Sequence, residues 1–348
     1  MNTLVARPDA AAAWIRQLAK RFAVFFPQRV GERSFRFDVV REGSAIEFAN
    51  YLPTIVPPNK KLMPAAEEIL RFKRQQDGVE FQPVLDTSPR VLAGVRSCDL
   101  RALMLMDAVQ ADGVKDPYYF ARRENTAIIA VDCLAPCDDR AFCQATGSLG
   151  HKGGADVFLT PVDGKLVVET LTPKGEDLVK DAAFEKSGDA QALLEKAARQ
   201  KPASFGRQLR APVGKLPALL RAAYRHPLWE KHVERCFSCG TCTLVCPTCY
   251  CFEVKDDVEL DLASGHRERT WDSCMLPAFA VVAGGHNFRG TAASRQRHRV
   301  KRKFEYLPER FGLGSFCVGC GRCGRQCTSH IDIYDIVNDV AAAQGAGS

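Results

Sequence analysis

Long hydrophobic runs are missing from this sequence, and none approaches the roughly 18 residues that a membrane-spanning helix requires. Charged residues at Arg16, Lys20 and Arg21 interrupt the apolar residues near the N-terminus, so the apolar segment of a secretory signal peptide is missing as well. Both absences favour a cytoplasmic protein that does not enter a membrane. The 348 residues, 46% hydrophobic and 26% charged, are typical of a globular chain longer than one average domain.

Two signatures of chemistry are also missing. The chain has no G-x4-G-K-[ST] phosphate-binding loop, and no convincing catalytic acid–base pair or triad stands out. Gly319, Gly321 and Gly324 do spell G-x-G-x-x-G, but cysteines occupy its variable positions, and a dinucleotide site needs a parallel strand–helix unit around the glycines. We therefore predict a non-catalytic chain, and we expect a partner subunit to carry any nicotinamide or flavin.

Cysteine is absent before residue 98, yet the chain contains 15 cysteines. They fall into three groups, at residues 98–143, 236–274 and 317–327. Disulfide frameworks belong mainly to small secreted domains, whereas clustered cysteines of cytosolic proteins more often bind metal. The distribution therefore favours metal binding.

The first part of the chain combines strand and helix patterns. The apolar run at 90–96 predicts a buried strand, residues 97–109 have helical spacing, and 126–133 predicts a second strand. This order predicts a parallel unit, in which ligands gather at the carboxyl ends of the strands. Residues 156–161 and 165–170 predict a hairpin, and 174–200 one or two helices. We expect a mixed α/β domain over residues 1–225.

The second part, residues 226–348, has mainly helical patterns. A helical stretch over residues 216–236 leads into the first cysteine run, and a final helix follows the second run. About seventy residues separate the two runs, far more than in a compact bacterial ferredoxin. An α-helical ferredoxin-like domain accommodates this gap. The predicted fold class is α+β, with a mixed α/β N-terminal domain followed by a mainly helical, α-helical-ferredoxin-like dicluster domain.

Two C-x2-C-x2-C-x3-C runs are the strongest motifs. This spacing lets three thiolates converge on one cubane, while the fourth reaches the neighbouring cluster. We therefore predict two [4Fe-4S] clusters with crossed ligands, the first held by Cys236, Cys239, Cys242 and Cys327 and the second by Cys317, Cys320, Cys323 and Cys246. Structural zinc also uses C-x2-C pairs, but two copies of the ferredoxin spacing favour clusters.

Four further cysteines lie in the first part of the chain, at Cys98, Cys133, Cys137 and Cys143. Cys98 and Cys133 follow the two predicted parallel strands, so the four thiols could converge on a metal. On spacing alone, a metal site and packing as small apolar residues remain equal alternatives. For the remaining Cys249, Cys251 and Cys274, we favour packing over a place beside the clusters.

Most of the concentrated positive charge lies in one run, Arg295–Arg302, which reads RQRHRVKR. Such a run can bind nucleic acid or an acidic partner, but it is more often a solvated face. We favour the solvated face. A nucleic-acid-binding protein with structural clusters is the alternative that this run motivates.

Taken together, these segments resemble the 4Fe-4S dicluster subunit family, which includes the beta subunit of cytoplasmic sulfhydrogenases and the corresponding subunit of anaerobic sulfite reductase. Family members often have a C-F-C triplet in the first domain, whereas this chain has Ala141-Phe142-Cys143, with Cys137 as the replacement ligand. The resemblance therefore favours a third [4Fe-4S] cluster. It is carried by residues 56–70, 94–103, 116–125, 133–143, 236–252, 271–289 and 317–333.

The resemblance implies an electron relay. Members of this family pass electrons between a flavin- and NAD(P)-binding subunit and a catalytic subunit, which is a nickel–iron hydrogenase or a siroheme sulfite reductase. The expectation for this chain is thus an iron–sulfur electron-transfer subunit of a soluble redox complex, with a hydrogenase of the sulfhydrogenase type as the preferred partner and a sulfite reductase as the alternative.

Overall fold

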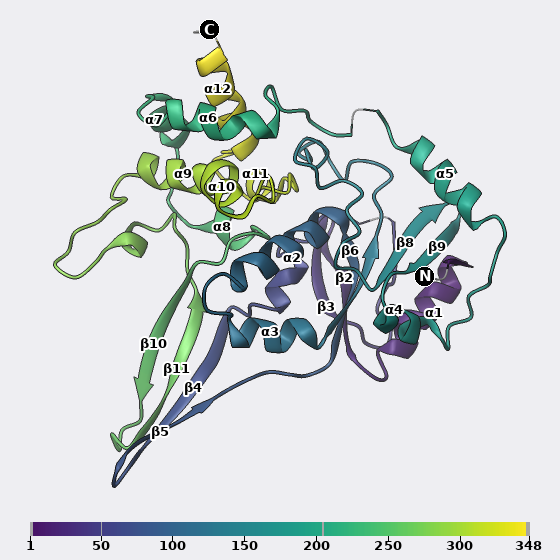
Figure 1. Cartoon of the computed structure of the whole chain (residues 1–348), viewed down its shortest axis with the longest axis horizontal. Coiled ribbons are helices and arrows are strands. Elements are labelled where there is room, and N and C mark those ends of the chain that lie inside the picture. Colours follow the sequence, from purple (N-terminus) through teal and green to yellow (C-terminus); the bar gives the residue numbers. More distant parts are fainter. Residues whose placement is uncertain (1–2, 50, 204, 346–348) are drawn as a thin grey trace.

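A mixed sheet of seven strands organises the first part of the chain (Figure 1). The computed structural model describes residues 3–49, 51–203 and 205–345. Neighbouring strands β2, β6, β7 and β8 run parallel, and the outer strands are antiparallel. The order across the sheet is β1 (Thr3–Ala6), β9 (Lys165–Thr170), β8 (Val157–Val162), β7 (Thr126–Val131), β6 (Arg90–Arg96), β2 (Ala23–Gly31) and β3 (Ser34–Val39).

Both predicted supersecondary units are confirmed. Strand β6, helix α2 (Ser97–Gln110) and strand β7 form the parallel unit. Strands β8 and β9 form the hairpin, whose turn places Asp163 at φ 49° and Gly164 at φ 70°. Two successive positive φ angles match the twist of a tight hairpin, and Asp-Gly is a favoured pair there.

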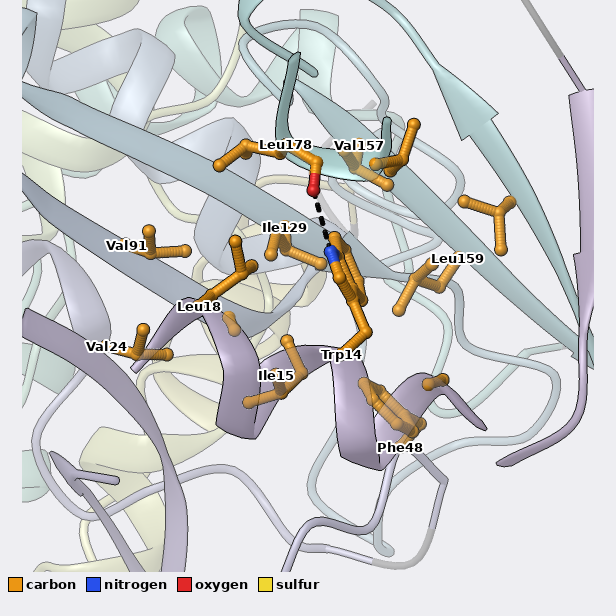
Figure 2. Close-up of a cluster of buried hydrophobic side chains, with 14 of the residues drawn as sticks. Trp14, Ile15, Leu18, Val24, Phe48, Val91, Ile129, Val157, Leu159 and Leu178 are labelled. Carbon is orange, nitrogen blue, oxygen red and sulfur yellow. Dashed lines mark hydrogen bonds between the residues drawn. The ribbon is translucent and has the colours of Figure 1, made fainter. Parts of the chain in front are cut away.

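The two faces of the sheet are covered by different helices, which buries the central strands on both sides. Val91 and Ile129 pack under helices α1 (Pro8–Leu18) and α4 (Pro173–Val179), whereas Leu92 and Ile128 pack under α2 and α3 (Pro117–Glu124). Figure 2 shows the α1 side, where Trp14 donates a hydrogen bond of 2.8 Å to the carbonyl of Leu178. Burial on both faces explains why these strands are continuous apolar runs.

The predicted helices around 216–236 and after the second cysteine run are present. Trp229 and Phe304 are buried in the core of this part. The helices after the first sheet are α5 (Ala190–Gln200), α6 (Leu216–Ala222), α7 (Leu228–Val233), α8 (Thr241–Leu244), α9 (Ala292–Lys301), α10 (Leu307–Phe311), α11 (Arg322–Arg325) and α12 (Ile333–Gly345), with a π-helical turn at Arg302–Tyr306 and 3-10 turns at Val213–Lys215 and Pro277–Ala280. A further 3-10 turn, Pro58–Lys61, lies earlier, between β3 and β4.

A second sheet, absent from the sequence predictions, projects from the body (Figure 1). Its order is β10 (Phe252–Val258), β11 (Ser264–Trp271), β4 (Ala66–Gln75) and β5 (Gly78–Pro83). The gap between the cysteine runs therefore holds a β-hairpin as well as helices. Because β4 and β11 pair, strands from both sides of residue 225 share this sheet. The division at residue 225 itself stays a prediction.

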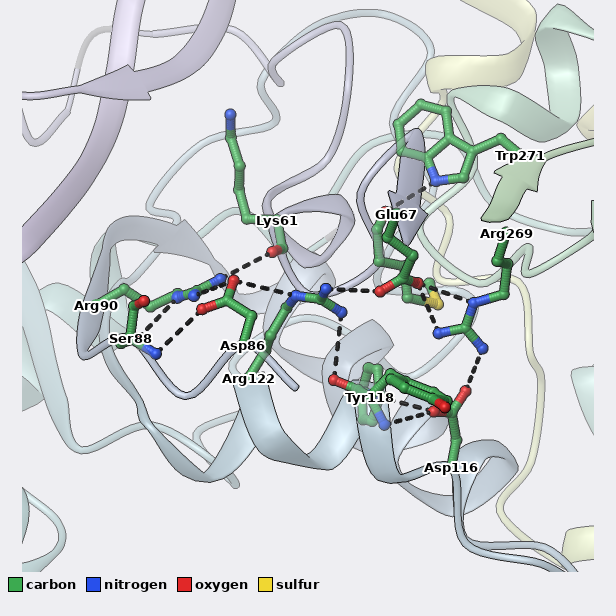
Figure 3. Close-up of polar contacts among 12 residues, drawn as sticks. Lys61, Glu67, Asp86, Ser88, Arg90, Asp116, Tyr118, Arg122, Arg269 and Trp271 are labelled. Atoms are coloured by element: carbon green, nitrogen blue, oxygen red, sulfur yellow. Dashed lines mark hydrogen bonds and ion pairs between the residues drawn. The ribbon is translucent and has the colours of Figure 1, made fainter. Parts of the chain in front are cut away.

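Buried ion pairs anchor the base of the second sheet to helix α3 (Figure 3). Glu67 of β4 forms ion pairs with Arg122 of α3 and with Arg269 of β11, each at 2.6 Å. Arg269 also pairs with Asp116, the N-cap of α3, at 2.5 Å. These contacts fix the hairpin β10–β11, and with it the segments just before and after the hairpin. In the described parts of the chain, no helix has both the length and the apolar character needed to cross a membrane.

Candidate metal centres

The first predicted ligand set lies around one cavity. Cys236, Cys239 and Cys242 come from the loop between α7 and α8 and from α8 itself, and Cys327 comes from the second run, after α11. The loop is tightly turned, with Ser238 at φ 53° and Gly240 at φ 79°. We call this set the distal centre. The fourth thiol thus comes from the other run, as the crossed arrangement requires, while ligation of iron by these thiols stays a prediction.

The second predicted set, which we call the middle centre, has the reciprocal arrangement. Cys317, Cys320 and Cys323 of the second run border a cavity together with Cys246 of the first run. Gly319 (φ 65°) and Gly321 (φ 70°) shape the loop between the thiols. A Cβ on Gly319 would lie 2.5 Å from the backbone of Phe142, so only glycine fits there. Phe142 also donates its backbone N–H to the carbonyl of Gly319 at 2.9 Å.

The third set, which we call the sheet centre, lies at the carboxyl ends of β6 and β7. Cys98 stands in the first turn of α2 and Cys133 two residues after β7. Cys143 interacts electrostatically with Cys133 and Cys137, and Cys98 interacts with Cys143. Cys98, Cys133 and Cys143 pack in one buried cluster, and Cys137 interacts electrostatically with two of them. In the same place, Arg96 directs a guanidinium N–H toward the sulfur of Cys133, with the nitrogen 3.7 Å away.

Burial disfavours the charged form of several of these thiols. It raises the pKa of Cys137 to about 11, with a further rise from Cys133, and it raises the pKa of Cys320 to about 12. A bound metal ion supplies the positive charge that stabilises thiolates, and its binding releases protons. Four thiols around one cavity are the donor chemistry that a [4Fe-4S] cluster needs, so the residues present at the distal and middle centres fit such a cluster. The sheet centre offers the same set of four thiols. Among the described residues, no group of Cys, His, Asp or Glu side chains is arranged to hold a single metal ion.

The prediction that the basic run is a solvated face is wrong. Arg295 and Arg299 are buried, with 4% and 3% of their surface exposed, and Lys303, just after the run, is also buried at 4%. These residues are spaced by four, so they share one face of α9 and its π-helical continuation. That face meets the cysteine loops, because Arg299 interacts with Cys242 and Cys323 and Lys303 with Cys246. The buried cations compensate the negative charge of thiolates.

Two buried lysines near the cysteine loops, Lys60 and Lys303, were not predicted from the sequence. Together with Arg295 and Arg299, we call them the cationic shell. Lys303 donates to Thr248, with its ammonium 2.5 Å from the carbonyl oxygen and 2.8 Å from the hydroxyl. Lys60 donates to the carbonyl of Cys249 at 2.8 Å. Burial by itself lowers the pKa of Lys303, but the charges of Cys246 and Cys249 outweigh burial and raise that pKa overall. The four-residue spacing of Arg295, Arg299 and Lys303 was the available signal, whereas nothing local marks Lys60.

A buried ion pair joins the middle centre to the sheet centre. Arg322, between Cys320 and Cys323, binds both carboxylate oxygens of Asp99, at 2.5 and 2.7 Å. Both side chains are nearly inaccessible, with 1% and 2% exposed. Arg322 also donates from Nε to the carbonyl of Thr54 at 2.7 Å. Because Asp99 directly follows Cys98, this pair fixes the two sets of thiols relative to each other.

Comparison with known proteins agrees with this geometry. Residues 235–331, which hold both cysteine runs, match the family described as the 4Fe-4S dicluster domain. The chain is 32% identical over 314 residues to the sulfhydrogenase 2 beta subunit of Pyrococcus furiosus, and the match covers 88% of this chain and 89% of that protein. This chain belongs to the 4Fe-4S dicluster subunit family. It is an iron–sulfur electron-transfer subunit, and the family resemblance seen in the sequence is confirmed.

Iron content tests the sheet centre of this dicluster subunit. Replacing Cys137→Ser removes one of its four thiols, so we expect the variant to hold about four fewer iron atoms per chain than the wild type, since one cubane is lost. Iron and sulfide assays on anaerobically purified protein measure this. Ser148→Ala, a buried neighbour without a thiol, is the control. An unchanged iron content in Cys137→Ser would remove that residue from the ligand set.

The cationic shell makes a second prediction, about reduction potential. Arg299→Met removes a buried positive charge beside the distal and middle centres. Loss of this charge favours the oxidised state of a cluster, because the oxidised state is less negative than the reduced state. A loss of about 1–2 kcal/mol of charge interaction corresponds to a potential lower by about 40–90 mV for one electron. Redox titration followed by electron paramagnetic resonance measures the shift. Arg297→Met is the matched control, because Arg297 of the same helix lies over Tyr224 and bonds to its carbonyl instead. Equal potentials in Arg299→Met and Arg297→Met would contradict the role of Arg299 in setting the cluster potential.

The buried ion pair makes a third prediction, about stability. Asp99→Asn leaves the guanidinium of Arg322 buried without its counter-charge, and breaking a buried pair in this way costs about 3–5 kcal/mol. We expect the thermal midpoint of the anaerobic protein to fall by several degrees. Asp112→Asn, which removes the carboxylate of a surface pair with Arg310, is the control and costs about 0–1 kcal/mol. A midpoint unchanged by Asp99→Asn would show that the pair does not hold the two parts together.

Proposed function

We propose that this chain relays electrons through three [4Fe-4S] clusters between a flavin- and NAD(P)-binding subunit and a nickel–iron hydrogenase subunit. The observation that carries this proposal is the succession of the three thiol sets. Helix α8, which carries Cys242 of the distal centre, packs against α11, which carries Cys323 of the middle centre, and the two residues interact electrostatically. Cys320 of the middle centre packs in one buried cluster with Cys98 and Cys143 of the sheet centre. A linear series of one-electron carriers is what a relay requires.

Exposure along the series supports two points of electron exchange. At the distal centre Cys239 is exposed, and the adjacent Phe237 is 75% exposed. At the sheet centre Cys137 borders an open cavity of about 490 Å³ that Arg29, Arg33 and Arg96 also line. The middle centre is enclosed, with Cys320 buried. Partner subunits can therefore approach the two ends, and the buried middle centre connects them.

The sulfhydrogenase relative makes a hydrogenase the preferred partner. All fifteen cysteines are unpaired in the structure, and we propose a cytoplasmic location because a reducing compartment keeps such thiols free. The nucleic-acid alternative rested on the basic run, and burial of Arg295 and Arg299 withdraws those charges from any phosphate surface. No acid–base group is needed for the relay, because the residues only hold the clusters and set their charge environment.

Purification of the tagged chain from its native host tests the partner. We expect a subunit with nickel and iron, and a second subunit with flavin, to co-purify. A bound siroheme subunit would instead identify the complex as a sulfite reductase. Dithionite should bleach the visible absorbance of the iron–thiolate centres, and the oxidised partner should restore it.

Electron transfer in the reconstituted complex tests the series itself. Cys320→Ser breaks the middle centre, so NAD(P)H-driven hydrogen evolution should fall sharply while dithionite still reduces the terminal centres. Ser315→Ala, a buried change on the same loop without loss of a thiol, is the control. Unchanged activity in Cys320→Ser would exclude the middle centre from the path.

A further inference from the structure

Three cysteines lie outside the three centres, and they share one cavity. Cys249, Cys251 and Cys274 line an open space of about 410 Å³, which we call the side cavity. Tyr250 and Phe279 provide part of its apolar wall. Packing as small core residues was the interpretation favoured from sequence, but the three thiols border an open cavity instead of being enclosed by core side chains.

The fold brings these thiols together through the hairpin β10–β11. Cys251 directly precedes β10, and Cys274 follows three residues after β11. The hairpin closes between them, where Phe252 pairs with Trp271 and the N–H of Asp272 donates to the carbonyl of Cys251 at 3.0 Å. As a result, Cys251 and Cys274 lie on the wall of the same cavity and interact electrostatically. Cys249 is only two residues from Cys251, so its thiol joins the same wall.

The side cavity adjoins two of the proposed centres. Cys249 interacts electrostatically with Cys246, which belongs to the middle centre, and its backbone N–H lies 3.4 Å from the carbonyl oxygen of Cys246. Cys274 interacts electrostatically with Cys242 of the distal centre. A redox group in the side cavity would therefore lie next to both carriers.

The wall of the side cavity is strongly cationic. Among the described lining residues there is no carboxylate, and the charged or ionisable ones besides the cysteines and Tyr250 are Arg289, His298, Arg299, Arg302 and Lys303. The Nε atoms of Arg289 and Arg299 are buried without a hydrogen-bond acceptor. Buried donors are almost always paired in native proteins, so these two N–H groups indicate a missing acceptor. Cluster sulfides and thiolates accept such bonds.

The size of the cavity favours a cluster over a single ion. A water molecule has a share of about 30 Å³ in the liquid, so the space far exceeds that of one metal ion. Its donors are thiols, its wall carries compensating charge, and its neighbours are two centres of the same donor chemistry. The size, donors and charge of the side cavity therefore fit a site for several iron atoms.

We propose that Cys249, Cys251 and Cys274 bind a further [4Fe-4S] cluster, held by three protein thiolates, whose fourth iron faces the side cavity. This inference adds a fourth iron–sulfur group beside the three-centre relay. It concerns cysteines that the relay does not use, so it can fail while the relay holds.

Iron content of a double variant tests the site. Cys251→Ala with Cys274→Ala should lower the iron content from about sixteen to about twelve atoms per chain, because one cubane is lost. The paramagnetic signals of the distal and middle centres should persist, which separates this result from failure of the relay proposal. Val258→Ala, exposed at the far end of β10, should keep the wild-type iron content. A double variant with wild-type iron content overturns the proposal.

A measurement on the wild-type protein decides the case if the double variant fails to fold. An anomalous map recorded at the iron edge from anaerobically grown crystals should show four iron positions beside Cys249, Cys251 and Cys274. A map without iron there, or with one zinc ion in its place, overturns the proposal. Iron at the three relay centres alone would refute the fourth cluster and leave the relay intact.

Discussion

The buried pair of Asp99 and Arg322 is the constraint on which the arrangement of the centres depends. Its two members come from the start of α2 and from the second cysteine run, 223 residues apart in the chain. Neither charge is solvated, so each is tolerated in the interior only because the other is present. Where Gly319 meets Phe142, the two parts touch backbone to backbone. The middle and sheet centres are thus held in one rigid interior, which suits a series of electron carriers.

Charge balance in the interior links this architecture to electron transfer. Thiolate-bound clusters carry negative charge, and a protein tunes their potentials through nearby charges, hydrogen bonds and burial. Here α9 contributes Arg295 and Arg299 to the thiol-facing side, and Lys303 follows on the π-helical turn. The charges of Arg295, Arg299 and Lys303 are therefore buried, where they act on the centres instead of on an external partner.

Sequence reasoning missed the strands in which apolar and polar residues do not alternate clearly. Strand β10 is exposed along its whole length, so burial imposes no alternation of apolar and polar residues on it. The four strands of the second sheet form only because β4 and β11 pair across a long stretch of chain. The basic run was misassigned for a related reason, since a sequence shows the spacing of charges along a helix but not which face meets the thiols.

The sequence alone determined the local features of this protein. The spacing within each cysteine run, the apolar runs of β6 and β7, and the Asp-Gly turn of the hairpin depend on neighbouring residues, so covalent geometry and local pattern made them predictable. Only the tertiary structure decided which cations surround the thiols and how the centres follow one another. Lys60 reaches the segment of Cys249 across 189 positions, and Arg322 reaches Asp99 across 223. Such contacts depend on how distant segments pack, which no local pattern encodes.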